Sequence, residues 1–150
     1  RKIDLFFFSC EENMGTHFVF ADADIQFFGE CKDVVLEELG EKDFACQNDV
    51  ICACSGFFIA KGNKKVLDMF HRMGSHYEAE DQTSLNRNLH MVDWKMLSHR
   101  FFTIAMVTGN RWYGQDVEIP KDILVHHANW TTGVDNKIKL LEFVKAKMTT

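Results

Sequence analysis

The stretch HFVFADADIQFF, residues 17–28, decides the fold class that we expect for this chain. It opens with an apolar run at 17–21, which is typical of a buried parallel strand. Asp22 and Asp24 follow, and a second apolar run begins directly after them. In an extended chain, side chains at positions i and i+2 point to the same side, with their Cα atoms roughly 6.6 Å apart. We therefore expect both carboxylates to face one polar site at the end of a strand, where open α/β sheets bind ligands.

Paired carboxylates supply the oxygen ligands that Mg²⁺ and Mn²⁺ prefer. The structural alternative is that such a pair caps a turn or faces solvent. The apolar residues on both sides favour a metal, because burying two unpaired carboxylates is costly without a counter-ion. We predict that Asp22 and Asp24 bind a divalent cation.

Around this stretch, strand and helix patterns alternate without a linker or a repeat, which predicts one α/β domain. Helices are expected at 2–13, 33–39, 63–77, 81–89 and 134–148, and strands at 17–21, 44–46, 56–60 and 123–125. The helix capped by Asn63 has an apolar face formed by Val66, Leu67, Phe70, Met73 and Tyr77. The last helix has one formed by Val134, Ile138, Leu141, Val144 and Met148. Residues 94–120 are expected to hold short strands and an aromatic loop around Trp112 and Tyr113.

The composition suits a globular domain and argues against two kinds of partner. The 150 residues are 46% hydrophobic, and 17 basic against 22 acidic residues give a net charge of −5. No cluster of Lys or Arg is longer than two residues, which argues against a nucleic-acid partner. No apolar run approaches the ~20 residues that span a bilayer, so we expect no membrane segment in this chain. An acidic protein that binds a phosphorylated ligand needs a cation to do so.

A second candidate group lies near the C-terminus, where His126 and His127 precede Gly133 and Lys137. A neutral imidazole at a strand end can ligate a metal, and a lysine can place a positive charge on a phosphate. The alternative is a loop histidine followed by a solvated lysine at the start of a helix.

Two further motifs carry possible chemistry. Asp81 and Gln82 begin the sequence DQTSLN, where they could hold sugar hydroxyls or stabilise an oxocarbenium-like transition state. The alternative is that Asp81 only caps a helix. Ser55 and Gly56 precede an apolar strand and let the backbone approach a ligand closely, unless they form a β-bulge.

Taken together, four motifs in this order resemble the nucleotide-diphospho-sugar transferases, the glycosyltransferases of the GT-A fold. The matching stretches are FVFADADIQFF, SGFFIAK, DQTSLN and HHANWTTGVDNK. Cys54 stands where the family commonly has Asn. The resemblance covers about residues 1 to 145 and implies a mixed, mostly parallel sheet flanked by helices.

The resemblance implies a metal site with three protein ligands. Asp24 would ligate the cation, and Asp22 would contact both the cation and the ribose. His127 would be the third ligand, with His126 as a substitute. The implied cofactor is Mn²⁺ or Mg²⁺.

The resemblance also implies how the substrate is held. Lys137 and the backbone near Gly133 would bind the pyrophosphate. Asp81 and Gln82 would contact the donor sugar on its reactive face. Ser55 and Gly56 would line the sugar pocket.

The implied activity is that of a hexosyl- or pentosyltransferase. It would move a sugar from a nucleoside diphosphate sugar, with a UDP-sugar favoured, to a hydroxyl of a glycan or protein acceptor. DQTSLN is similar to the motif of retaining members, whereas in an inverting enzyme Asp81 would be the general base. The alternative function is a non-catalytic or degenerate module that binds metal, glycan or a protein partner. A carboxylate-pair hydrolase is disfavoured, because two acids on one strand cannot easily flank a sugar from opposite faces.

Two expectations concern the extent and location of the domain. Family members begin with a strand–loop–helix unit that cradles the base, whereas this chain opens at the helix before the D-x-D strand. We therefore expect residues 1–150 to be the C-terminal two-thirds of a catalytic domain. Five scattered cysteines indicate reduced thiols and favour the cytoplasm, while a Golgi-lumenal protein would need an anchor upstream.

Overall fold

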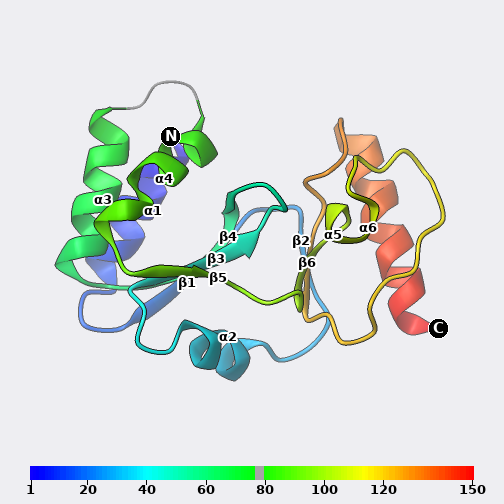
Figure 1. Ribbon diagram of the computed structural model, residues 1–150, viewed down its shortest axis with the longest axis horizontal. Helices are drawn as coiled ribbons and strands as arrows, with labels where there is room; N and C mark the ends of the chain where they lie inside the picture. Colours follow the sequence, from blue (N-terminus) through cyan, green and yellow to red (C-terminus); the bar gives the residue numbers. More distant parts are fainter. Residues whose placement is uncertain (77–79) are drawn as a thin grey trace.

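The computed structural model describes residues 1–76 and 80–150 and has a mixed α/β architecture. Two small sheets follow one another along the long axis of the molecule, with helices at both ends (Figure 1). At one end lie α1 (Lys2–Glu12), α3 (Lys64–Ser75) and α4 (Asp81–Asn88). At the other end lie α5 (Ala105–Thr108) and α6 (Val134–Thr149), and α2 (Lys32–Leu39) lies beneath the first sheet. Within the described part of the chain, no helix has the length and apolar character needed to cross a membrane.

The two sheets each combine parallel and antiparallel pairing. The first has the strand order β1-β4-β3-β5, formed by His17–Ala21, Ala53–Lys61, Phe44–Asn48 and Trp94–Met96. The second has the order β2-β7-β6, formed by Ile25–Phe27, Val125–His127 and Phe101–Thr103. The pairs β3–β5 and β6–β7 are parallel, and the pairs β1–β4, β3–β4 and β2–β7 are antiparallel. The expected mixed sheet flanked by helices is confirmed, although antiparallel pairs outnumber the parallel ones that were expected to dominate.

Strand β1 differs from the buried parallel strand that its apolar sequence predicted. It pairs antiparallel with β4 and forms an edge of the first sheet. Phe18 and Phe20 face the core, whereas Val19 is exposed. The apolar run is therefore buried on one face only, because side chains alternate across a strand.

Phenylalanine rings fill the core between the first sheet and its helices. The ring of Phe58 on β4 lies 5.0 Å from Phe6 of α1 and 4.8 Å from Phe44 of β3, measured between centroids. Offset and edge-to-face pairs of this kind add to the stabilisation from buried area. This packing fixes α1 against the sheet and so sets where the N-terminal residues lie relative to β1.

Helix α3 begins as the sequence predicts. The side chain of Asn63 accepts a hydrogen bond from the Val66 amide at 3.0 Å, which is an N-cap. Val66, Phe70 and Met73 are buried along one face. Tyr77, predicted to extend that face, lies outside the described residues.

The C-terminal half shows two differences from the predicted pattern. The strand expected at 123–125 is observed at 125–127. On α6 the buried residues are Leu140 and Val144, whereas the side chain of Val134 is 74% exposed. The predicted apolar face of α6 is thus wrong at Val134 and also at Ile138, which is 48% exposed, because the helix packs on the core through Leu140 and Val144.

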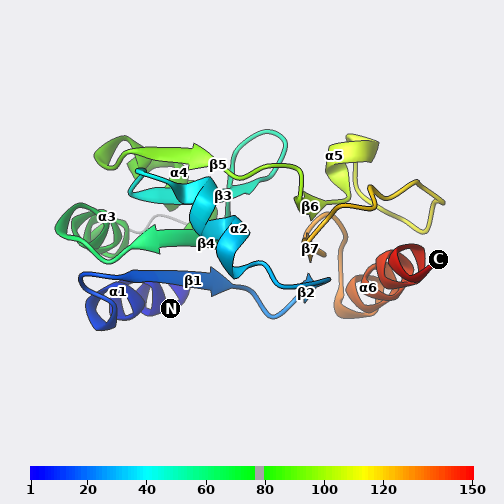
Figure 2. The same cartoon turned by 90° about the horizontal axis from the view of Figure 1, so that it is seen from below.

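The acidic pair joins the two sheets. Strand β1 of the first sheet ends at Ala21, and β2 of the second begins at Ile25 (Figure 2). The amide of Ile25 donates to the carbonyl of Asp22 at 3.3 Å, so the connection is a tight turn. Asp22 and Asp24 therefore do not lie on one extended strand, as the spacing argument assumed, but on either side of this turn.

Candidate functional site

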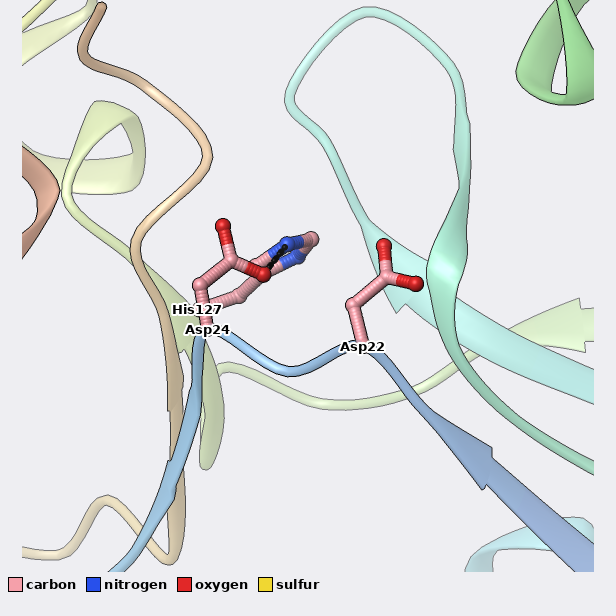
Figure 3. A group of neighbouring side chains, drawn as sticks. All are labelled: Asp22, Asp24 and His127. Carbon is pink, nitrogen blue, oxygen red and sulfur yellow. Dashed lines mark ion pairs between the residues drawn. The ribbon is translucent and has the colours of Figure 1, made fainter. Parts of the chain in front are cut away.

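Asp22, Asp24 and His127 converge at the junction of the two sheets (Figure 3). One ligand atom from each lies within 4.8 Å of the others. Strand β7 pairs with β2 so that His127 stands opposite Ile25, the residue after Asp24. The imidazole Nε2 of His127 lies 3.2 Å from Asp24 Oδ1. Strand pairing thus explains how an imidazole distant in sequence reaches the acidic turn.

This donor set fits a hard divalent cation. Bonds to such ions of roughly 2.0–2.2 Å place two ligand atoms up to about 4.4 Å apart. The observed group spans at most 4.8 Å, so small side-chain adjustments suffice to close it. Two carboxylates with one imidazole are a combination that suits Mn²⁺ or Mg²⁺.

Two lysines neutralise the acidic turn. Lys2 of α1 contacts Asp22 Oδ2 at 2.8 Å and Asp81 Oδ2 at 2.9 Å, and Lys137 of α6 contacts Asp24 Oδ2. Burial alone would lower the pKa of Lys2, but the two carboxylates outweigh it and raise that pKa. The hydrogen bond from His127 lowers the pKa of Asp24 and, together with Lys137, overcomes the opposing effect of burial.

Asp81 is directed into the site rather than capping its helix. It is the first residue of α4, and Glu80 is the N-cap. The hydroxyl of Ser55 donates to Asp81 Oδ2 at 2.5 Å, and Lys2 contacts the same oxygen. Burial opposes ionisation of Asp81, yet these two partners lower its pKa.

Asp49 holds the opposite wall of the site together. Its Oδ1 accepts hydrogen bonds at 2.6 Å from Asn129 Nδ2 and from Trp130 Nε1. Its Oδ2 accepts one at 2.9 Å from Gln82 Nε2. A carboxylate that is 7% exposed thereby connects the β3–β4 hairpin with α4 and with the loop after β7.

Gly56 lies directly beneath Asp22, Asp24 and His127, the candidate metal ligands that are called the metal-binding group below. A Cβ atom at this position would lie 2.3 Å from His127 Cε1 and 2.7 Å from Asp22 Oδ2. Neither distance is compatible with a side chain, so the glycine makes room for both groups. Ser55 and Gly56 belong to strand β4, at the point where its pairing with β3 is irregular. Cys46 stands opposite Phe58 and Asn48 opposite Ala53, so the extra residues lie between Ala53 and Phe58, and the alternative of a bulge at Ser55 and Gly56 agrees with this register.

Helix α6 begins beside the acidic turn. Gly133 precedes it with φ at +81°, a conformation that side chains rarely adopt, and the amide of Lys137 donates to the Gly133 carbonyl. A helix N-terminus with a nearby lysine is suited to a phosphate group. Gly133 itself does not line the pocket.

His126 faces away from this group. It is fully buried, its Nδ1 lies 3.1 Å from Gln26 Oε1, and its Nε2 has no hydrogen-bond partner in the described structure. Burial lowers the pKa of His126 to about 3. The structure therefore places His127, and not His126, beside the two acids.

One pocket of about 630 Å³ contains nearly all of the predicted site residues. These are Asp22, Asp24, Ser55, Gly56, Asp81, Gln82, His127 and Lys137. It also contains residues that the sequence did not single out, namely Lys2, Asp49, Glu80, Arg111, Asn129 and Trp130. A signal for Asn129 and Trp130 was present, since both belong to the motif HHANWTTGVDNK, but Lys2 and Arg111 stand in no recognisable pattern.

The comparisons with known proteins identify the family and the fold of this chain. Residues 12–141 match the nucleotide-diphospho-sugar transferase family, and the chain belongs to this family. Its fold is similar to the crystal structure of the glycosyltransferase GlyE from Streptococcus pneumoniae TIGR4, with a TM-score of 0.56 and 16% identity. The match covers 91% of this chain and 42% of the GlyE chain. A search of curated proteins gives no match.

Proposed function

We propose that this chain carries the metal and donor-sugar site of a glycosyltransferase that uses a nucleoside diphosphate sugar, with a UDP-sugar favoured. The acceptor would be a hydroxyl of a glycan or protein, and the cation Mn²⁺ or Mg²⁺. The observation that carries the proposal is the convergence of Asp22, Asp24 and His127 in one pocket with Asp81 and Lys137.

The charge of the pocket supports a divalent cation. Five carboxylates line it against three cationic side chains, which gives a formal charge of −2 when His127 is neutral. A diphosphate would be repelled by such a site, because like charges at close range are unfavourable in a partly buried pocket. One divalent cation would bring the pocket to neutrality, and it would act as a Lewis acid on the leaving diphosphate.

The protein's own groups would divide the donor between them. Lys137 and the first turn of α6 would bind the diphosphate through positive charge and backbone amides. On the other side of the acidic turn, Ser55, Asp81 and Lys2 form a connected polar surface suited to sugar hydroxyls. Gln82, held by Asp49, would present its remaining amide oxygen to the sugar.

We infer retention of the anomeric configuration. A general base must take a proton at neutral pH, and a carboxylate with a lowered pKa does so poorly. Asp81 has a lowered pKa because Ser55 and Lys2 stabilise its charge. This favours a role in binding the sugar over a role as base. An NMR assignment of the product anomer tests the inference, and an inverted linkage would refute it.

Hydrolysis of UDP-sugars in the presence of Mn²⁺ tests the activity itself. The proposed site predicts turnover that EDTA abolishes and that Asp24→Asn reduces at least 100-fold. The matched control is Asp68→Asn, which removes a surface acid from an exposed ion pair with Lys64 and is expected to leave turnover unchanged. Turnover that survives Asp24→Asn would eliminate the metal mechanism. Mn²⁺ binding without any turnover would support the alternative of a non-catalytic binding module.

A further inference from the structure

A buried glutamine lies behind the imidazole of His127. Gln47 sits near the end of β3 and is fully buried. Its Oε1 lies 3.0 Å from His127 Nδ1. The other ring nitrogen, Nε2, faces Asp24 at 3.2 Å. Gln47 therefore contacts the side of the ring that is turned away from the metal-binding group.

The orientation of the Gln47 amide is determined by its other partners. Its Nε2 donates to the backbone carbonyls of Phe101 at 3.2 Å and Phe102 at 2.9 Å. Carbonyl oxygens only accept hydrogen bonds, so the group that faces them must be the NH₂. A flipped amide would place its oxygen against two carbonyl oxygens in a dry interior, which is strongly unfavourable. The atom that faces His127 is therefore the amide oxygen.

An amide oxygen requires a donor, and this determines the form of the imidazole. In a neutral imidazole one nitrogen carries the proton and the other carries the free lone pair. A proton must lie on Nδ1 to satisfy Gln47. Without a cation, Nε2 faces Asp24 at 3.2 Å and can donate a second proton to it, and a bound cation would take the place of that proton on Nε2. We propose that Gln47 is a positioning residue that fixes the Nδ1–H tautomer of His127 and so prepares Nε2 as a metal ligand. The second part of this proposal, the metal ligand, rests on the proposed function, which requires a metal at this site.

Cys54 is compatible with this arrangement. Its sulfur lies 3.5 Å from His127 Nδ1 and accepts a hydrogen bond from the Gly56 amide. Burial raises the pKa of Cys54 to about 12, so its thiol stays neutral. The sulfur can share the Nδ1 proton as a weak second acceptor, but it provides no anion that would compete with Gln47.

The neighbouring histidine provides a matched control within the same strand. Gln26 donates through Nε2 to the carbonyl of Leu141 at 3.0 Å, and its Oε1 lies 3.1 Å from His126 Nδ1. The same reasoning assigns His126 the same tautomer. Its Nε2, however, lies in the protein interior, outside the pocket, and has no hydrogen-bond partner among the described residues. Replacing Gln26 thus perturbs a buried Gln–His pair without touching the metal-binding group.

The first test is a ¹⁵N NMR assignment of the His127 ring in metal-free protein at about pH 8, above the ordinary pKa of histidine. We expect a protonated Nδ1, whether or not Nε2 holds a second proton toward Asp24 in the metal-free protein. A ring protonated at Nε2 alone, or an equal mixture of the two tautomers, would overturn the proposal. This measurement does not depend on catalysis, so it separates the role of Gln47 from the proposed transferase activity.

The second test compares the Mn²⁺ affinity of the wild type with that of two variants, measured by electron paramagnetic resonance of the free ion. Gln47→Leu removes the acceptor and should weaken binding 10- to 100-fold, as loss of outer-shell partners of a metal-bound histidine does. Gln26→Leu should stay within twofold of the wild type. Unchanged binding in Gln47→Leu, or an equal loss in Gln26→Leu, would overturn the proposal.

Gln47→Leu also leaves two carbonyls without donors, so the variant could fail to fold. Gln47→Glu is the second variant, because a glutamic acid that its buried position keeps neutral can donate its hydroxyl to the Phe102 carbonyl and keep its other oxygen as an acceptor for His127 Nδ1. It should preserve the Nδ1–H tautomer in the NMR assignment, and a shift of the proton to Nε2 would count against the proposal. If the wild type bound no Mn²⁺, the proposed function would be refuted, while the NMR assignment would still decide the role of Gln47.

Discussion

Gly56→Ala adds a single methyl group beneath the metal-binding group, and its effect can be worked out from the structure. The new Cβ would lie 2.3 Å from His127 Cε1 and 2.7 Å from Asp22 Oδ2. Ordinary contacts between carbon atoms are about 3.5–4.0 Å. The imidazole would therefore have to move by more than about 1 Å, or the central strand β4 would have to shift away from it.

Neither movement is easy. His127 is 4% exposed, and its ring is held between Gln47 and Asp24. On the other side, the carbonyl of Gly56 accepts a 2.8 Å hydrogen bond from the Asp22 amide, which ties β4 to the acidic turn. We expect the free energy of unfolding to fall by about 1–3 kcal/mol, the usual effect of overpacking. We expect Mn²⁺ affinity to fall at least about 10-fold, since an altered His127 position disrupts the ligand set.

Calorimetric titration with Mn²⁺ and urea unfolding measure the two effects. The matched control is Gly29→Ala, where the new Cβ would meet only a Leu124 methyl group at 3.8 Å, an ordinary contact. A Gly56→Ala protein that binds Mn²⁺ as tightly as the wild type would show that His127 and Asp22 do not form the binding group as the structure places them.

Three further outcomes follow from the charges of the site. Lys2→Met should lower the free energy of unfolding by about 1–3 kcal/mol in urea titrations, because it leaves Asp22 and Asp81 close together without their shared cation in a partly exposed site. Lys64→Met, at an exposed helical ion pair, should cost less than about 0.5 kcal/mol, and equal effects would contradict the reasoning. Acid should also destabilise the fold, because Asp24 and Asp81 have pKa values below those of the unfolded chain. Their contribution to the free energy of unfolding is complete above the unfolded pKa of about 3.9 and is lost as the pH falls below it. Urea titrations should therefore give a lower free energy of unfolding at pH 3 than at pH 7, and this difference should be smaller in Lys2→Met. Saturating Mn²⁺, at about 100 times its Kd, should add about 2.7 kcal/mol and raise Tm by roughly 5–10 °C in differential scanning fluorimetry, whereas an unchanged Tm would contradict a folded-state metal site.

Local sequence was enough to predict the elements that carry the motifs. The Asn63 cap sets the start of α3, and Gly40 ends α2 with φ at +53°. Both the Asn63 cap and Gly40 act on backbone within a few residues, so distant segments do not change where these helices begin and end. Their agreement with the observed boundaries shows why the helices were easier to predict than the sheet pairings.

The directions in which the strands pair could not be predicted from the sequence, because they depend on segments that are distant along the chain. The run at 17–21 is as apolar as a buried parallel strand, yet it forms an antiparallel edge with β4. The acidic pair was expected on one extended strand, whereas a turn between two sheets brings Asp22 and Asp24 together. The composition of a strand records how much of it is buried, but it does not record which strand lies beside it.

The residues that support the site were the hardest to predict. Lys2 carries no motif, and it reaches Asp22 and Asp81 only because the Phe6 core fixes α1 against the sheet. Asp49 resembles an ordinary hairpin acid in sequence. Its three donors come from α4 and the loop after β7, which only the folded chain brings together.

The position of the site at the junction of two sheets gives these supporting contacts their importance. Asp22 follows the last residue of β1 in the first sheet, whereas Asp24 precedes β2 and His127 ends β7 in the second. A metal site split in this way is only as well ordered as the connection between its halves, since misplacement of one ligand by about 1 Å is costly. Gln47 provides such a connection, because it belongs to the first sheet and bonds to carbonyls and to His127 in the second. The buried polar contacts behind the pocket thus hold the two sheets in the register that the metal-binding group requires.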